Sequence, residues 1–100
     1  MKLSEILQAV REQNLTKTQL ESYHTTLSGL YGDLKVEEGT LLKEKALFFY
    51  ERTNPETPDV KIRRAWDASP HGQRLIEVKA MIPTIKTQLN SLKSRLYLLY

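Results

Sequence analysis

The most regular apolar pattern of the chain lies in its C-terminal third. All a and d positions of four consecutive heptads are apolar, and they hold Leu75, Val78, Ile82, Ile85, Leu89, Leu92, Leu96 and Leu99. A repeat of this kind is typical of a coiled-coil seam. Pro83 stands outside the seam, at a b position, where it can bend a helix while the apolar stripe continues. The pattern predicts a long helix over residues 70–99.

A second heptad pattern predicts another long helix, over residues 17–52. An apolar residue recurs every seven positions, at Leu20, Leu27, Leu34, Leu41 and Phe48. Thr16 followed by Gln19 is a capping-box pattern, which marks the start of a helix.

The middle of this second helix is its weakest part. Each glycine in a helix interior costs about 1 kcal/mol relative to alanine, and the segment contains Gly29, Gly32 and Gly39. Beyond them the apolar stripe moves sideways, to Leu42, Ala46 and Phe49. A break within residues 28–40 is therefore an alternative to one continuous helix.

Two shorter helices complete the predicted elements. Ser4 is a typical N-cap for a helix over residues 4–13, which is too short to be stable without packing on another segment. The polar, proline-rich residues 53–58 predict a loop.

Residues typical of a helix start follow this loop, and the same combination occurs a second time. Thr57 as N-cap, with Pro58 at the first helical position, predicts a helix over residues 59–68. Ser69 and Pro70 give the same signal again, and a helix that runs through them with a kink is the alternative.

The lengths of the elements favour a single all-α domain over residues 1–100, built as an antiparallel hairpin. The two long segments span about 54 Å and about 46 Å, and the short N-terminal helix would pack across the open end. Two charged rows favour this pairing. The acidic row holds Glu37, Glu44 and Glu51, and the basic row holds Lys79, Lys86 and Lys93.

Composition argues against an enzyme and against a bound metal or cofactor. The 100 residues include no Cys and two His, and they contain neither a phosphate-binding glycine loop nor an HExxH motif. His24 lies on the same helix face as Leu20 and Leu27, at the edge of that apolar stripe. His71 is expected to be solvated in a turn. Acid pairs such as Glu37 and Glu38 are expected on a solvated or ion-paired face rather than in a catalytic dyad.

Other absences bear on localisation. No run of apolar residues is long enough for a membrane span, and the N-terminus does not resemble a signal peptide. We therefore expect a cytoplasmic protein without a membrane partner or a small-molecule substrate.

One cluster of bases surrounds the only tryptophan of the chain. The candidate nucleic-acid contacts are Lys61, Arg63, Arg64, Trp66 and Arg74. Basic side chains bind phosphates, and an exposed tryptophan can stack on an unpaired base. The alternative is that Trp66 and Ile62 pack into the closed end of the hairpin while the bases are solvated.

The C-terminal residues form a candidate interface. Exposure of an apolar run to water is costly, and the last five residues are Leu96, Tyr97, Leu98, Leu99 and Tyr100. We expect them to contact a second copy of the chain or another protein, with a homo-oligomer as the first expectation.

Two stretches, residues 41–53 and 61–97, resemble small helical proteins encoded in bacteriophage genomes. The similarity is carried by the sequence LLKEKALFFYERT and by a run from Ser91 to Leu96, SLKSRL. Proteins of this type are accessory factors near replication and recombination genes, mostly without assigned activity. The resemblance implies no functional residue for this chain.

The expected function is thus a non-enzymatic, helical protein–protein interaction module, encoded by a phage as an accessory or host-directed factor. One alternative is an accessory nucleic-acid-binding protein that uses the cluster around Trp66. Another is a small inhibitor of a host defence nuclease.

Overall fold

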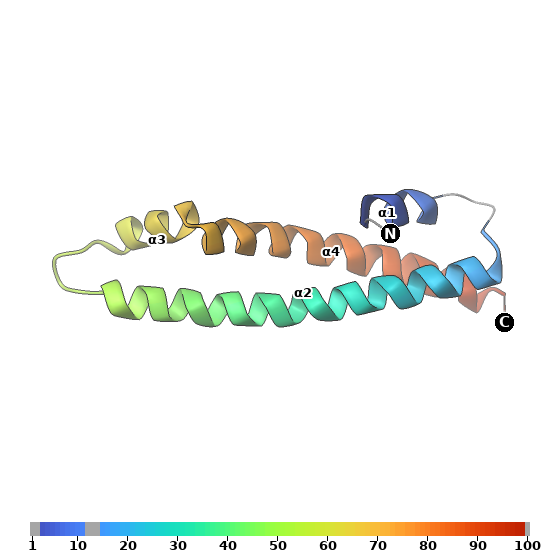
Figure 1. Cartoon of the computed structure of the whole chain (residues 1–100), viewed down its shortest axis with the longest axis horizontal. Coiled ribbons are helices and arrows are strands. Elements are labelled where there is room, and N and C mark those ends of the chain that lie inside the picture. Colours follow the sequence, from blue (N-terminus) through green and yellow to red (C-terminus); the bar gives the residue numbers. More distant parts are fainter. Residues whose placement is uncertain (1–2, 12–14, 100) are drawn as a thin grey trace. The chain divides into compact units, whose positions relative to one another are not determined.

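The computed structural model describes residues 3–11 and 15–99, and its regular elements there are all helical (Figure 1). This result confirms the all-α class. The helices are α1 (Leu3–Val10), α2 (Lys17–Arg52), α3 (Asp59–Ala68) and α4 (Pro70–Tyr97). The bounds of α2 and α3 are those predicted. Helix α4 ends two residues before the predicted limit, and α1 ends at Val10, while positions 12 and 13 of its predicted range lie outside the described residues.

The predicted capping box begins α2. The backbone N–H of Thr16 donates to Gln19 Oε1 at 2.9 Å, and the backbone N–H of Gln19 donates to Thr16 Oγ1 at 3.2 Å. These two bonds satisfy backbone donors that have no partner inside the helix. The alternative of a break within residues 28–40 is wrong, because α2 is helical throughout. Burial of Leu27 and Leu41 in the core offsets the cost of the glycines between them.

The N-cap of α3 differs from the prediction by one residue, although the helix has the predicted bounds. Pro58, not Thr57, occupies the N-cap, and it makes no side-chain cap bond. The Thr57 hydroxyl instead donates to Asn54 Oδ1 at 3.0 Å, and the same oxygen accepts the backbone N–H of Glu56 at 2.9 Å. The turn that Asn54 organises therefore uses the hydroxyl that was expected to cap the helix.

Ser69 separates α3 from α4. Its backbone is extended, with φ −74° and ψ 156°, so the helix does not run through this position. Ser69 Oγ donates to the backbone oxygen of Trp66 and accepts the backbone N–H of Gly72 at 3.0 Å. One side chain thus closes α3 and caps α4. The turn is tight, since a Cβ added at Gly72 would lie 1.8 Å from the backbone oxygen of Trp66.

The chain divides into two compact units. Unit 1 comprises residues 1–33 and 82–100, and unit 2 comprises residues 34–81. In unit 1, α1 lies alongside the last part of α4 (Figure 1), and a guanidinium N–H of Arg95 donates to the backbone oxygen of Val10. The buried apolar residues of this unit are Ile6, Val10, Leu20, Leu27, Ile82, Ile85 and Leu92.

Unit 2 is built from the second half of α2, all of α3 and the first part of α4. Phe48 on α2 meets Trp66 on α3 edge to face, with ring centroids 5.4 Å apart, and Glu37 near the other end of the α2 segment contacts Arg74. The α2 segment therefore runs in the direction opposite to α3 and α4 within this unit. Its core holds Leu34, Leu41, Ile62, Trp66, Leu75 and Val78.

Most positions that the heptad patterns predict to be buried are buried or half-buried in the structure. In α2 the four leucines of the heptad pattern are buried and Phe48 is half-buried. In α4 the positions from Leu75 to Leu92 are buried or half-buried, whereas Leu99, beyond the end of the helix, is 54% exposed. No helix of the described residues is long and apolar enough to cross a membrane.

Candidate interaction surfaces

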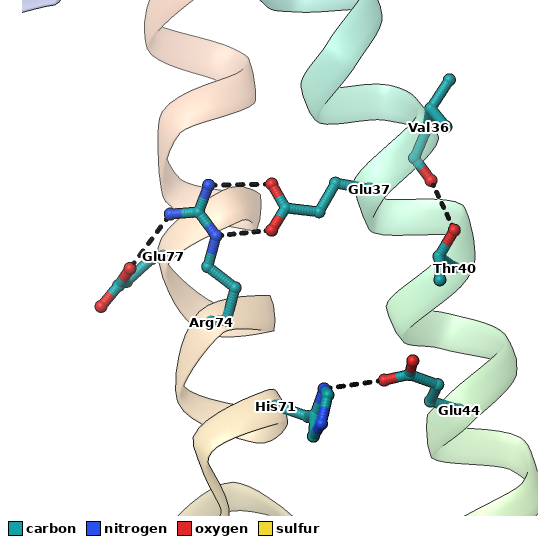
Figure 2. A network of polar contacts seen from close by, with 7 residues as sticks. All are labelled: Val36, Glu37, Thr40, Glu44, His71, Arg74 and Glu77. Atoms are coloured by element: carbon teal, nitrogen blue, oxygen red, sulfur yellow. Dashed lines mark hydrogen bonds and ion pairs between the residues drawn. The ribbon is translucent and has the colours of Figure 1, made fainter.

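A polar network joins α2 to α4 inside unit 2 (Figure 2). The Arg74 guanidinium binds the Glu37 carboxylate through two bonds, from Nε to Oε2 at 2.6 Å and from Nη2 to Oε1 at 2.8 Å. The third side of the guanidinium donates from Nη1 to Glu77 Oε2 at 3.2 Å. Paired bonds of this geometry fix the orientation of both groups. The network therefore links α2 and α4 in a single register within unit 2.

The same contacts shift the titration of both partners. The hydrogen bonds from Arg74 lower the pKa of Glu37, while partial burial opposes the shift. The two carboxylates raise the pKa of Arg74 further above its usual range, so this side chain keeps its positive charge. Both side chains remain more than a third exposed, at 40% for Arg74 and 36% for Glu37. Solvent therefore weakens the pairing energy.

Of two expectations about charged residues, one is confirmed in part and one is wrong. His71 is solvated as expected, with a side chain that is 65% exposed, but it lies in the first turn of α4 and its Nδ1 is 2.8 Å from Glu44 Oε2 (Figure 2). Among the described residues, the acidic row does not pair with the lysine row. In the register of unit 2, Glu37 and Glu44 face the beginning of α4, which precedes Lys79 in the chain.

The basic cluster around Trp66 is only partly available to a ligand. Trp66 is 3% exposed and packs against Phe48, so it cannot stack on a nucleic-acid base from this position. Arg74 is held by two carboxylates. The remaining candidate contacts are exposed, namely Lys61, Arg63 and Arg64.

The candidate interface at the C-terminus is exposed in unit 1. Tyr97 is 80% exposed and Leu98 is 83% exposed, whereas Leu96 is half-buried and Tyr100 lies outside the described residues. Tyr97 and Leu98 line a mostly apolar hollow of about 350 Å³ together with Lys93 and Ser94. We call the exposed residues Tyr97, Leu98 and Leu99 the C-terminal patch.

Sequence reasoning did not identify the pairing of Glu37 with Arg74 or of Glu44 with His71. No local sequence pattern relates a residue on α2 to one on α4. The signal that could have found them is the heptad register of the two helices, aligned in opposite directions.

Comparisons with known proteins add no relative to this picture, because no protein-family model, no curated protein and no solved structure matches the chain significantly. Within residues 3–11 and 15–99, no group of three or more His, Asp or Glu side chains is placed to hold a metal ion. No site residue can therefore be transferred from a relative, and the candidate surfaces rest on their own residues and contacts.

Proposed function

We propose that the protein is a helical protein–protein interaction module and that the C-terminal patch is its contact surface. The observation that carries the proposal is the exposure of Tyr97 and Leu98, each at least four-fifths accessible to water. Aromatic and large aliphatic side chains dominate the binding energy of protein interfaces once they are buried. An adjacent apolar hollow gives a partner side chain a place to bind.

A second copy of the chain is the first partner that we propose. The three residues of the patch carry no charge, so two patches can cover each other without bringing like charges together. The same proposal includes coiled-coil packing of the heptad positions of α2 against those of α4 within each unit, which leaves the C-terminal patch as the surface for a partner. Origin from a phage and inhibition of a host nuclease stay predictions from the resemblance.

Sedimentation of the wild-type chain and of the double variant Tyr97→Ser, Leu98→Ser tests this proposal. At micromolar concentration the wild-type protein should sediment as a species heavier than the 11.6 kDa monomer. The double variant should sediment as a monomer with unchanged helical circular dichroism. Ile76→Ser, which alters a residue 52% exposed on α4 in unit 2, is the matched control and should associate as the wild type does. A wild-type monomer would contradict the proposal.

A second candidate function is nucleic-acid binding through exposed bases. Lys61, Arg63 and Arg64 are all exposed on α3, which favours contact with phosphates rather than with bases of the nucleic acid. Binding of this kind should be strongest at low salt. A mobility shift with duplex or single-stranded DNA at about 50 mM salt would support it, and the absence of a shift there would dismiss it.

A further inference from the structure

A second apolar seam lies on α2 in unit 2, away from the core. Gly39, Leu42, Ala46 and Phe49 follow each other at intervals of three, four and three residues, which places them on one face of the helix. Leu42 is 40% exposed, Gly39 and Ala46 are exposed, and Phe49 is half-buried. We call these four residues the outer seam. It accounts for the sideways movement of the apolar stripe seen in the sequence.

The outer seam alternates small and large residues. A Cβ added at Gly39 would meet nothing within 4 Å, so the space above this position is open. Another helix can therefore approach closely at Gly39 and Ala46, while Leu42 and Phe49 insert between its side chains. Arg63 of α3 joins Leu42, Ala46 and Phe49 around a hollow of about 370 Å³. This shape fits a helix lying in a groove.

The charges beside the outer seam that have no ion-pair partner are positive, whereas Glu38, one turn before Leu42, is paired with Lys35. Lys43 and Lys45 flank the seam on its two sides, and Arg63 lies beside it on α3. None of these three residues forms an ion pair with an acid among the described residues. Lys45 Nζ lies 5.9 Å from the centre of the Phe49 ring, which keeps this charge next to the apolar surface.

We propose that the outer seam binds an acidic amphipathic helix of another protein. The partner would place apolar residues on the seam and Glu or Asp at the positions that face Lys43 and Lys45. Charges at such flanking positions select the partner of a paired helix. A second copy of this chain does not fit, because two outer seams in contact would bring these lysines against their own counterparts.

This proposal uses residues of unit 2 and is independent of the C-terminal patch. The double variant Tyr97→Ser, Leu98→Ser should therefore bind the acidic helix as the wild type does. Loss of self-association in that variant, with unchanged helix binding, would separate the two surfaces.

The experiment measures binding of a labelled helical peptide to the full chain by fluorescence anisotropy. The peptide has about three heptads, with Leu at a and d and Glu at e and g. Repulsion between these glutamates also keeps the peptide from pairing with itself. We expect micromolar affinity, which falls by about tenfold or more in Lys43→Glu, Lys45→Glu and as salt is raised. Leu42→Ser should weaken binding without loss of helicity.

Three controls decide the outcome. Arg64→Glu, Lys79→Glu has the same change in net charge at other exposed positions and should bind like the wild type. A peptide with Lys in place of Glu should not bind. The proposal is overturned if the acidic peptide shows no binding at about 1 mM, or if both double variants weaken binding equally. It is also overturned if a short single-stranded DNA binds through Lys43 and Lys45 while the peptide does not.

Discussion

At the scale of single residues, two glycines of unit 2 have opposite roles. Gly72 lies against the backbone of Trp66, where any Cβ would collide with the carbonyl oxygen at 1.8 Å. Gly39 lies in an open stretch of α2, where a Cβ meets nothing within 4 Å. Backbone atoms cannot move aside as a flexible side chain can, so the first position requires glycine and the second does not.

Gly72→Ala and Gly39→Ala should therefore shift stability in opposite directions. We expect Gly72→Ala to lower the free energy of unfolding by about 2 kcal/mol or more through steric strain. Gly39→Ala should raise it by about 0.5–1 kcal/mol, since alanine restricts the unfolded chain and favours helix. Urea unfolding followed by circular dichroism measures both values. Equal effects of the two substitutions would contradict the geometry at Ser69–Gly72.

The Glu37 carboxylate makes stability depend on pH. Its pKa is lowered in the folded protein by the bonds from Arg74, so the folded state prefers the ionised form. The stabilisation is complete above the ordinary value of 4.5 and is lost as the pH falls through the lower folded pKa.

Comparison of the wild type with Glu37→Gln tests this dependence. The difference in free energy of unfolding should be about 1 kcal/mol or less near neutral pH, because the pair is exposed, and should vanish in acid. Lys35 pairs with Glu38 at 3.3 Å on the same helix, so Glu38→Gln is a control of equal charge change. A difference that stays constant down to strongly acidic pH would contradict the role of Arg74.

At the scale of elements, the contact between α2 and α3 depends on the aromatic pair Phe48 and Trp66. The rings meet edge to face at 5.4 Å, and the Arg52 guanidinium lies 3.6 Å from the centre of the Phe48 ring. Stacked cations and edge-to-face rings add to the energy of burial. The short α3 is thus attached mainly by the two buried residues of its inner face, Ile62 and Trp66.

The emission of the single tryptophan reports this attachment. Trp66 should emit at short wavelength and resist quenching by iodide, because it is 3% exposed. Phe48→Ala should shift the emission to longer wavelength and increase quenching, whereas Tyr50→Ala, at a residue 83% exposed, should change neither. Strong quenching in the wild-type protein would contradict the packing of α3 on α2.

At the scale of the whole molecule, much of the helical order was predictable from local patterns. The bounds of α2 and α3 follow from the capping box, the polar loop and the repeated leucines, since these signals act within a few residues. The buried faces follow from the heptad spacing for the same reason. The C-terminal patch was also predictable, because residues 96–99 are all aliphatic or aromatic.

The contacts of individual charged and aromatic side chains were not predictable in the same way. The sequence by itself determined where the main helical segments lie and which face of each is apolar, because these properties depend on spacing along one chain segment. It left open whether α2 continues past its glycines and whether α3 and α4 are separate. Only the tertiary structure decided that Trp66 is buried, that Arg74 holds Glu37, and that Leu42 and Ala46 stay exposed. The physical reason is register. A side chain on one helix meets its partner only when packing aligns the other helix beside it.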